Sequence, residues 1–429
     1  MSGILSYGTY LPRHRLGDRV VASYDEDATT MAVEAARAAL ADAPLPESVW
    51  FATTSPPYLD KTNAAILHAA LDLPRSTFAA DVGGAARSGI AALLAAAGAE
   101  GLATLSDVRT GLPDSADEKL GGDGAAAFLF GSGDVIAELL GTVSATVEVL
   151  DRWRSPHSST ARQWEERFGA DQLTPLIDEV SQCVLAEAGL TTADRTVLVS
   201  PNAVLRRKAS ASSPIGHAGA ADAGLALAAA LDTAEPGQTI LLVSVADGCD
   251  ALLFRTTDEL TRRRQAVPVA AQLNAGLQVD YLRYLSWRGL VRREPPRRPE
   301  PEAPAGPPSA RAAQWKFALA GSGCTKCGFV HLPPVRVCKS CGVTDLMEPV
   351  SLARATGTIA TYTVDRLAYS ESPPVVQAVV DFEGGGRYTF EVADATPDEL
   401  AVGRQVSMTF RRLFTANDVH NYFWKARLS

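Results

Sequence analysis

A proline-rich stretch constrains the fold most, because it divides the chain into two parts that need separate hydrophobic cores. Residues 295–308 read PPRRPEPEAPAGPP, with seven prolines, no aromatic side chain and no repeating apolar pattern. Such a segment buries little apolar surface and stays extended and semi-rigid. We therefore expect a linker over residues 291–313, between a large domain at residues 1–290 and a smaller part that follows.

The large part alternates strand-like and helix-like runs. GILSYGTYLP (residues 3–12) predicts a strand, and ATTMAVEAARAALA (28–41) has helical apolar spacing behind acidic residues that suit a helix N-terminus. In the second half, RTVLVSP (195–201) and QTILLVSVADGCDALLFR (238–255) predict strands around a small-residue helix at 216–234. This alternation predicts a layered α/β fold whose sheets are covered on both faces.

Composition and charge exclude several classes of protein. The chain is 46% hydrophobic and 21% charged, as is typical of a globular protein. Its net charge of -9 argues against a nucleic-acid or anionic-membrane partner. No apolar run approaches the roughly 20 residues of a membrane span, and the N-terminal residues lack the pattern of a signal peptide. We therefore expect a cytoplasmic protein without a membrane partner.

Six stretches of the large part, in this order, carry a resemblance to a known family. They are GILSYGTYLPRHRL, FATTSPPYLDKTNAA, DVGGAARSG, GGDGAAAFLFGSG, DRWRSPHSSTARQWEERFG and IGHAGAADAGLALAAALD. Together they resemble the thiolase superfamily, and within it the 3-hydroxy-3-methylglutaryl-CoA synthase-like branch. The resemblance covers nearly all of the first 290 residues. It implies a five-layer αβαβα fold made of two similar halves, assembled as dimers, and a CoA thioester as ligand.

The positions that the resemblance makes catalytic depart from the family. Arg87, in DVGGAARSG, stands where the family has its nucleophilic cysteine, and a guanidinium cannot act as a nucleophile because it stays protonated. Thr54 stands at the position of the family's acid, and Pro201 or Asn202 at that of its histidine base. Three departures together predict that the family's condensation chemistry is lost.

Three other residues are candidates for a changed chemistry. His217 stands where the family has a catalytic-loop asparagine, so it either faces the old pocket or is a hydrogen-bonded histidine at a helix entry. Ser88 needs an adjacent base to act as a nucleophile, and support of the first helical turn is the simpler role. Cys249 lies either near the pocket floor or in the core as a small apolar residue.

Arg87 also poses an electrostatic problem. A cation at a helix N-terminus faces the positive end of the helix dipole, which costs on the order of 0.3–1 kcal/mol. If it is buried, it needs an acidic partner. We expect that partner to be Asp81 or Asp222, and we expect the Arg87 side chain to fill the space of a substrate acyl group.

Four of the six cysteines lie close together after the linker. The run GCTKCGFVHLPPVRVCKSCG contains two C-x-x-C pairs, Cys324 with Cys327 and Cys338 with Cys341, separated by ten residues. Four thiolates at this spacing predict a structural zinc ion in a ribbon at residues 314–348, with a leading helix. His331 lies between the pairs as a surplus ligand.

Short strands punctuated by glycine-rich turns fill residues 349–429, which predicts a small antiparallel barrel. A zinc ribbon followed by such a barrel resembles the OB-fold acyl-CoA-associated proteins that accompany thiolases. OB barrels also bind nucleic acids, but residues 314–429 hold twelve basic and eleven acidic side chains. A nucleic-acid groove would show a basic excess, so we expect no nucleic-acid partner.

Two hypotheses of different classes follow, with a weaker third. The first is a non-nucleophilic subunit of a thiolase-type acyltransferase complex, which forms a homodimer within a hetero-oligomer and docks on a separate active thiolase subunit. The second is a self-sufficient acyl-CoA enzyme whose changed site uses His217, Ser88 or Cys249. The third is a nucleic-acid binder that uses the zinc ribbon and the barrel.

Overall fold

The structure, a computed structural model, describes residues 2–156, 158–274, 276–294 and 297–429. The chain forms two compact units. Unit 1 contains the N-terminal residues up to Ala22 together with Asp27–Leu67 and Pro74–Val279. Unit 2 contains Ser23–Glu26, His68–Leu73 and Asp280–Ser429.

Unit 1 alternates strands with helices, as the apolar patterns predict. Its elements are β1 (Gly3–Tyr10), β2 (His14–Leu16), β3 (Arg19–Val21), α1 (Ala28–Ala39), β4 (Ser48–Thr53), α2 (Ala64–Ala70), β5 (Phe78–Gly83), α3 (Ser88–Gly98), β6 (Leu102–Asp107), α4 (Ala116–Leu120), β7 (Gly124–Gly131), β8 (Ala137–Thr146), β9 (Arg152–Trp153), β10 (Arg162–Gln163), α5 (Glu166–Glu187), β11 (Arg195–Val199), α6 (Ala203–Lys208), the 3₁₀ turn η1 (Gly219–Ala221), α7 (Asp222–Thr233), β12 (Thr239–Val245), β13 (Gly248–Thr256), α8 (Glu259–Arg262), α9 (Val269–Asn274) and β14 (Leu277–Gln278).

Nine of these strands form one mixed sheet in the order β11-β12-β13-β8-β1-β7-β6-β4-β5. It consists of two halves joined where β1 pairs with β8 through only two residues, Gly3 and Ile4. β4 runs parallel to both β5 and β6, and β11 runs parallel to β12. The carboxyl ends of parallel neighbours therefore lie at the same edge of their half, where α/β proteins bind their ligands.

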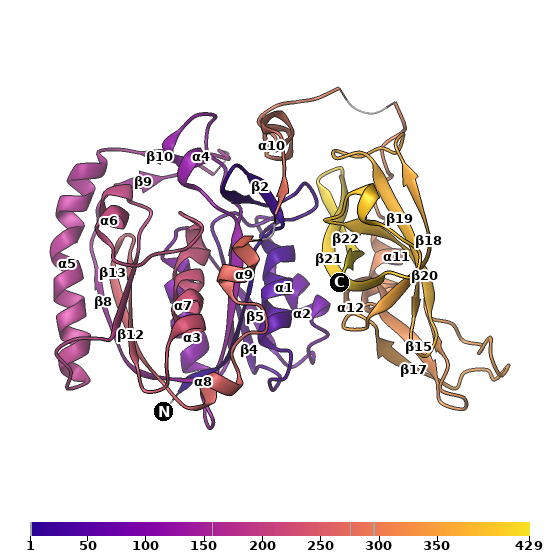
Figure 1. The fold of residues 1–429 in the computed structure, drawn as a ribbon, viewed down its shortest axis with the longest axis horizontal. Coiled ribbons are helices and arrows are strands. Elements are labelled where there is room, and N and C mark those ends of the chain that lie inside the picture. The colour runs from indigo at the N-terminus through magenta and orange to yellow at the C-terminus, as the bar shows by residue number, and fades with distance from the viewer. Residues whose placement is uncertain (1, 157, 275, 295–296) are drawn as a thin grey trace. The chain divides into compact units, whose positions relative to one another are not determined.

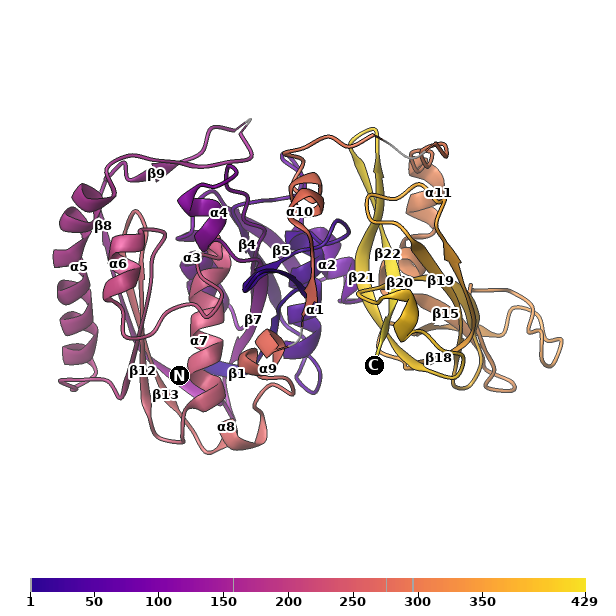
Figure 2. The same cartoon turned by 45° about the horizontal axis from the view of Figure 1, so that its top comes forward.

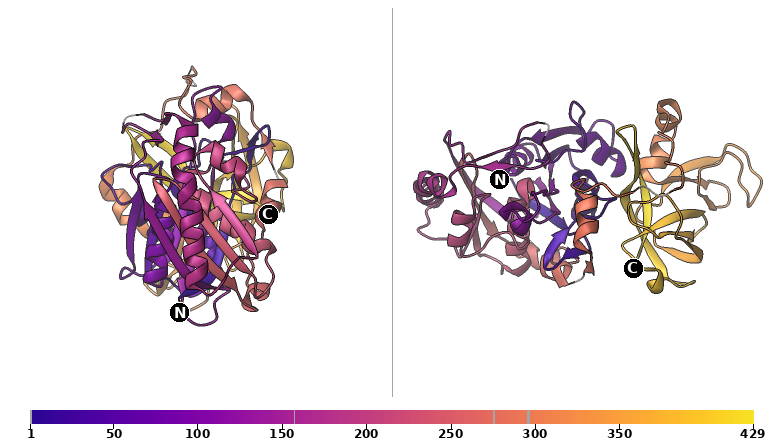
Figure 3. Two further views of the ribbon diagram at one scale, coloured as in Figure 1. Left: turned by 90° about the vertical axis from the view of Figure 1, so that its left-hand side faces the viewer. Right: turned by 90° about the horizontal axis from the view of Figure 1, so that it is seen from above.

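Helices cover the halves of this sheet in layers (Figure 1). α1 packs on β1 and β7 of one half, whereas α5 packs on β8 and β13 of the other. α3 and α7 lie between the halves, where Ile90 and Leu225 belong to one continuous apolar core. Figure 3 shows α5 from outside, across the strands that it covers. The result is the five-layer αβαβα arrangement that the resemblance implies.

The glycines of DVGGAARSG shape the turn from β5 into α3. Gly84 adopts a φ of +115°, a conformation that side chains other than hydrogen rarely tolerate. Gly89 lies against the carbonyl oxygen of Ala220, and a Cβ atom there would overlap that oxygen. The two glycines thus allow a sharp strand-to-helix turn and close packing of α3 against η1, and Arg87 is fixed at the helix N-terminus.

Unit 2 carries a zinc-ribbon-like sheet and a closed barrel, as predicted. The ribbon strands pair in the order β16-β15-β17, and the barrel closes in the order β18-β19-β20-β22-β21 (Figure 2). The elements are α10 (Tyr281–Trp287), α11 (Gly306–Arg311), α12 (Ala313–Ala318), β15 (Ala320–Cys324), β16 (Val330–His331), β17 (Met347–Ser351), β18 (Gly357–Asp365), β19 (Val375–Phe382), β20 (Arg387–Ala393), η2 (Pro397–Glu399), β21 (Gln405–Ala416) and β22 (Val419–Leu428).

The predicted linker is extended only in part. α11 begins inside it, with Pro307 and Pro308 in the first helical turn, where the missing N–H group of proline costs no hydrogen bond. Residues 295–296 lie outside the described residues. α10 belongs to unit 2, although its residues fall within the large domain that the sequence predicts at residues 1–290.

Buried charges in unit 2 neutralise one another. The Nζ atom of Lys425 lies 3.0 Å from Asp25 and 2.7 Å from Glu391, and Arg411 contacts both Glu26 and Asp394. Burial on its own would raise the pKa of Asp25, but Lys425 and Arg411 hold it well below the usual range. Buried charges are tolerated only when they are paired in this way.

None of the helices in the described ranges is long and apolar enough to cross a membrane.

Candidate functional site

A cavity of about 100 Å³ opens in unit 1 at the carboxyl ends of several strands. Thr54 follows β4, Arg109 follows β6, Pro201 follows β11 and Ala246 follows β12, and all four line it. His217, just before η1, lines it as well. Two positions at which the sequence departs from the family, Thr54 and Pro201, therefore meet at one site with the candidate His217.

Arg87 is held in an ion pair beside this cavity. Its Nε and Nη2 atoms donate to Asp250, at 2.8 Å each, and its Nη1 atom donates to the carbonyl oxygen of Asp247 at 2.9 Å. The hydrogen bonds to Asp250 raise the pKa of the guanidinium further. Arg87 remains a cation, so it offers no nucleophile.

The predicted partners of Arg87 were wrong. Asp81 caps the start of α2, accepting hydrogen bonds from the main chain of Asn63 and Ala64 at 2.7 Å each. Asp222 binds His217. The bidentate partner comes instead from β13, because the side chain of Arg87 extends across to the second half of the sheet. Its neighbours Gly84, Ala85 and Ala86 line the cavity but Arg87 does not, so the expectation that it fills the acyl space was also wrong.

His217 and Asp222 form a buried pair at the cavity. The Nδ1 atom of His217 lies 2.7 Å from Oδ2 of Asp222, and the Nε2 atom has no hydrogen-bond partner among the described residues. Burial lowers the pKa of His217 to about 4, and Arg109 adds to this shift against the opposing effect of Asp222. The imidazole is therefore neutral at physiological pH, with Nδ1 as the donor to Asp222 and Nε2 as an acceptor.

Asp107, at the end of β6, organises the strand ends around the cavity. It accepts hydrogen bonds from the hydroxyl groups of Thr54, at 2.8 Å, and Ser55, at 2.6 Å, and from the main-chain N–H of Ala220, at 2.8 Å. The hydroxyl oxygen of Thr54 also accepts a hydrogen bond from Nη1 of Arg109 at 2.9 Å. Thr54 therefore has a positioning role where the family has an acid.

The other candidates lie outside the cavity lining. Ser88 is buried in the first turn of α3, and its hydroxyl meets no base among the residues that the structure describes. Cys249 is fully buried in the core beneath α5, where burial raises the pKa of its thiol to about 12. Asn202 caps α6 by accepting from Val204 and Leu205. These positions support helix ends and core packing.

The sequence interpretation missed Asp250, Asp107 and Arg109. Each lies in or directly after a strand, and Asp107 and Arg109 follow the apolar run of β6 at the ligand-binding edge. A search for charged residues at the carboxyl ends of buried strands would have found this pair. Asp250 has no such signal, because it lies inside the apolar strand β13.

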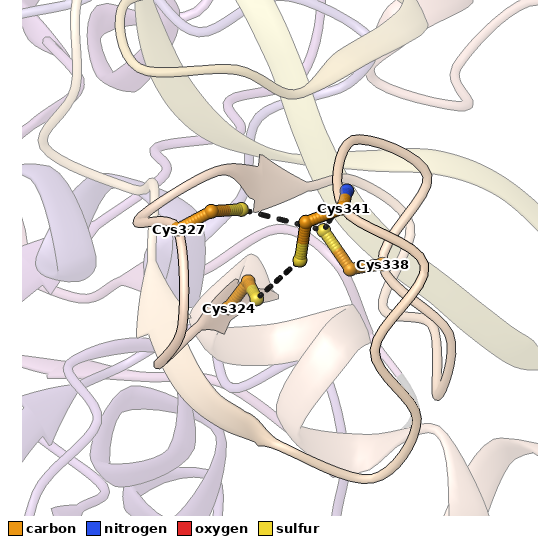
Figure 4. A group of neighbouring side chains, drawn as sticks. All are labelled: Cys324, Cys327, Cys338 and Cys341. Atoms are coloured by element: carbon orange, nitrogen blue, oxygen red, sulfur yellow. Dashed lines mark hydrogen bonds between the residues drawn. The ribbon is translucent and has the colours of Figure 1, made fainter.

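Four cysteines of unit 2 meet at a second site, which has metal-binding geometry. The sulfur atoms of Cys324, Cys327, Cys338 and Cys341 all lie within 4.8 Å of one another, and Figure 4 shows the four side chains pointing toward a common centre. Two sulfur–sulfur distances are 3.7 and 3.6 Å. Sulfurs at about 2.3 Å from a tetrahedral zinc ion would lie roughly 3.8 Å apart, so these residues fit that ion.

His331 is buried next to this site. Its Nε2 atom lies 3.4 Å from the sulfur of Cys338. Four sulfurs already complete a tetrahedron, so the position suits a hydrogen bond to a thiolate rather than a fifth ligand. This arrangement agrees with the prediction of His331 as a surplus ligand.

Solved structures define the class of unit 1 as thiolase-like. A 3-hydroxy-3-methylglutaryl-CoA synthase solved with CoA is 16% identical, has a TM-score of 0.57 and covers 66% of this chain and 89% of its own. The 3-oxoacyl-(acyl carrier protein) synthase III of Pseudomonas aeruginosa is 20% identical and has a TM-score of 0.53. The match covers 60% of this chain and 98% of that enzyme. The fold of unit 1 is therefore that of the thiolase superfamily.

Sequence comparison identifies the family to which the chain belongs. The hydroxymethylglutaryl-CoA synthase of Methanopyrus kandleri is 30% identical over 334 residues, which are 66% of this chain and 95% of that enzyme. The hydroxymethylglutaryl-CoA synthase of Pyrobaculum neutrophilum is 30% identical over 343 residues, which are 68% of this chain and 98% of that enzyme. The chain belongs to the hydroxymethylglutaryl-CoA synthase family.

Unit 2 matches two further families. Residues 318–346 match the family described as the ChsH2 rubredoxin-like zinc ribbon domain. Residues 350–411 match the ChsH2 C-terminal OB-fold domain. These matches confirm the zinc ribbon and the OB-fold barrel.

Proposed function

We propose that this chain is the non-nucleophilic subunit of a thiolase-type complex that acts on CoA thioesters. The observation that carries the proposal is the Arg87–Asp250 ion pair. It puts a permanent cation where the family has its nucleophile, and no cysteine lines the cavity among the described residues. Without a thiolate the chain cannot form the covalent acyl intermediate, so a separate active subunit has to supply it.

The cavity supports a role in holding the acyl end of the thioester. The cavity has a volume of about 100 Å³, and Thr54, Arg109 and His217 are among the residues that line it. Two similar structures contain CoA and 3-hydroxy-3-methylglutaryl-CoA. In this proposal the chain binds such a thioester and presents it to its partner without attacking it.

The edge strand β5 supports the docking of an active thiolase-type subunit. Within the described residues, β5 pairs only with β4, and every residue of β5 is partly or fully exposed, whereas most of β4 is buried. Phe78 at its start exposes 57% of its surface. An uncovered edge strand with an apolar side chain favours pairing with a strand of another chain. One strand edge pairs with one partner, so in this proposal the homodimer of this chain within the hetero-oligomer uses another surface.

Unit 2 has an accessory role in this proposal. A structural zinc ion held by the four cysteines keeps the ribbon folded, and the OB-fold barrel helps to organise the partner subunit. The nearly balanced charge of this unit supports a protein partner rather than a nucleic acid.

Mass spectrometry tests the central claim. After incubation with acetyl-CoA, we expect the purified chain to carry no acyl adduct, and we expect no condensation with acetoacetyl-CoA. The variant Arg87→Cys should not condense these substrates either, because Thr54 and Pro201 still replace the acid and the base. An adduct on Ser88 or Cys249 of the wild-type protein would contradict the proposal.

The His217–Asp222 pair favours a second candidate, an acyl-CoA enzyme without a covalent intermediate. A neutral imidazole that is oriented by a carboxylate and has its free nitrogen available is the arrangement of a general base. Turnover of an acyl-CoA by the isolated chain, lost in His217→Ala and retained in Arg87→Met, would establish this candidate. If the isolated chain turns over no acyl-CoA, the result supports the first candidate, the non-nucleophilic subunit.

A further inference from the structure

His331 contacts the predicted metal site from outside the four cysteines. Its Nε2 atom lies 3.4 Å from the sulfur of Cys338, and the residue is only 3% exposed. Apart from the cysteines themselves, no other side chain in the described ranges makes a hydrogen bond to one of the four sulfurs. A tetrahedral site has no fifth position to fill, so another role has to explain the place of this histidine.

The charge of the site makes a hydrogen bond to its sulfurs favourable. Four thiolates around a divalent zinc ion leave a net charge of about -2. Cys338 is 1% exposed, whereas Cys327 is open to solvent. A buried negative charge is stabilised by groups that donate hydrogen bonds to it. The sulfur of Cys338 accepts one from the main-chain N–H of Cys341, at 3.5 Å, and it faces the imidazole of His331 on another side.

The state of Cys338 decides which atom of this contact is the donor. A thiolate that binds zinc has no proton, so it accepts hydrogen bonds and cannot donate one. The Nε2 atom of His331 therefore carries a hydrogen and donates it to the sulfur. Partners of this kind orient the ligands of a metal and commonly change its affinity by about 10- to 100-fold.

Two neighbouring segments hold His331 in this position. On one side β16 pairs with β15, where Ser322 lies opposite His331. Gly321 makes room there, because a Cβ atom at this residue would lie 2.5 Å from the carbonyl oxygen of His331. On the other side, the main-chain N–H of Val330 donates to the carbonyl oxygen of Gly384, at 3.1 Å, in the turn between β19 and β20.

Gly385 lets this turn of the barrel approach the ribbon closely. Its φ is +116°, and it forms a bridge with Val330. A Cβ atom at Gly385 would lie 2.6 Å from the carbonyl oxygen of Val330 and 3.0 Å from the ring of Phe329. The ring of Phe329 in turn packs on the imidazole of His331, with 4.8 Å between the ring centres. The barrel therefore contributes to the position of His331.

We propose that His331 is a positioning residue of the zinc site, which strengthens metal binding by donating its Nε2–H to Cys338 while the β19–β20 turn holds it in place. Metal binding by the ribbon is then coupled to the fold of the barrel. This role is independent of the proposed function, because it concerns contacts within unit 2 and no residue of the cavity.

Zinc affinity of the full chain, measured by competition with a chromogenic chelator, tests the hydrogen bond. We expect His331→Leu to bind zinc at least about tenfold more weakly than the wild-type chain. His331→Gln should stay within about threefold, because its amide N–H reaches the position of Nε2. With cobalt(II) in place of zinc, the lost hydrogen bond raises the energy of the sulfur lone pair. His331→Leu should therefore move the sulfur-to-cobalt charge-transfer band to longer wavelength, and His331→Gln should leave it in place.

The contribution of the barrel is tested at its turn. Gly385→Ala should weaken zinc binding, because its methyl group would displace β16 and the imidazole with it. Gly384→Ala is the matched control. Gly384 also has a positive φ, of +79°, so alanine strains the backbone there too, but a Cβ atom at this residue meets nothing within 4 Å. This variant should bind zinc as the wild-type chain does.

The opposite results would overturn the proposal. If His331→Leu binds zinc as tightly as the wild-type chain, the hydrogen bond contributes nothing. Equal losses in His331→Leu and His331→Gln would mean that the histidine acts by packing alone. If His331→Leu does not fold, His331→Asn takes its place, because its shorter amide stays polar but does not reach the sulfur; affinity equal to that of His331→Gln would then contradict the donor role. Equal zinc binding by Gly385→Ala and Gly384→Ala would show that the barrel does not position His331.

Discussion

The Arg87–Asp250 ion pair and the His217–Asp222 pair have opposite consequences for the chemistry that is possible at the cavity. Arg87 removes nucleophilic chemistry, because its guanidinium stays protonated and is tied to Asp250. His217 keeps the orientation that a base requires, with Nδ1 toward Asp222. The protonation state of His217 therefore decides whether the cavity can contain a base. The lowered pKa of His217 also leads to a measurable prediction.

We expect unit 1 to lose stability as the pH falls from about 6.5 toward 4. The folded state keeps His217 neutral until its pKa of about 4, whereas the unfolded chain protonates it near 6.5. Below pH 6.5 the unfolded state therefore binds the extra proton and gains stability relative to the folded state. At pH 4.5 the loss should amount to about 2 kcal/mol, which urea unfolding at pH 7.5 and 4.5 measures.

The variant His217→Gln provides the control for this prediction, because glutamine can donate to Asp222 but does not titrate. Its unfolding free energy should fall by less than that of the wild-type chain between the two pH values. Burial alone would raise the pKa of Asp222, but His217 holds it below the usual value of 3.8. Asp222 therefore changes the unfolding free energy only when the pH falls below about 3.8, outside the range of this measurement. Equal pH dependence of wild type and variant would show that His217 is not the group responsible.

The elements could be predicted from the sequence more fully than the site. Periodicity identified β1, α1, β11 and β12, because a strand or helix that buries apolar side chains repeats them at its own period. The partner of Arg87 could not be found this way. Asp250 lies 163 positions further along the chain, and the pair exists only because β13 folds beside the β5–α3 turn. The helix α11 was missed because its two prolines read as a linker, although proline suits a first helical turn.

The ribbon is the element whose stability depends most on its metal. Its strands β15, β16 and β17 are two to five residues long, too short for a core of their own, and four cysteines converge between them. We expect about one zinc ion per chain by elemental analysis. Cys324→Ser should remove the metal and unfold the ribbon, while Cys183→Ser, at an exposed thiol of α5, should keep it. A ribbon that stays folded after complete chelation would contradict this prediction.

At the scale of the whole molecule, the proposed complex depends on what covers β5. Strands inside a sheet have both edges paired, but β5 ends the nine-stranded sheet and leads directly into the turn that carries Arg87. A partner that pairs along β5 would therefore lie next to the cavity that, in our proposal, holds the acyl chain. The two functions of the subunit, binding the thioester and docking the active enzyme, would then use adjacent residues of one strand and its turn.

Replacing Phe78 by Asp tests this arrangement. Phe78 starts β5 and exposes 57% of its surface, so a carboxylate there adds charge to the edge and removes the ring contact with Trp50. On co-expression we expect the wild-type chain to co-purify with a thiolase-type subunit that has its own catalytic cysteine. Phe78→Asp should reduce the recovered complex at least about tenfold, because burying an unpaired carboxylate at an interface is costly.

Leu59→Asp is the matched control, since Leu59 exposes 74% of its surface outside β5. This variant should co-purify as the wild-type chain does, and both variants should unfold at similar urea concentrations. Light scattering distinguishes a lost second copy of this chain from a lost thiolase subunit by the mass that remains. If Phe78→Asp retains the complex, the partner does not pair along β5. If the thiolase subunit is fully active and never binds the wild-type chain, the proposed partnership itself is wrong.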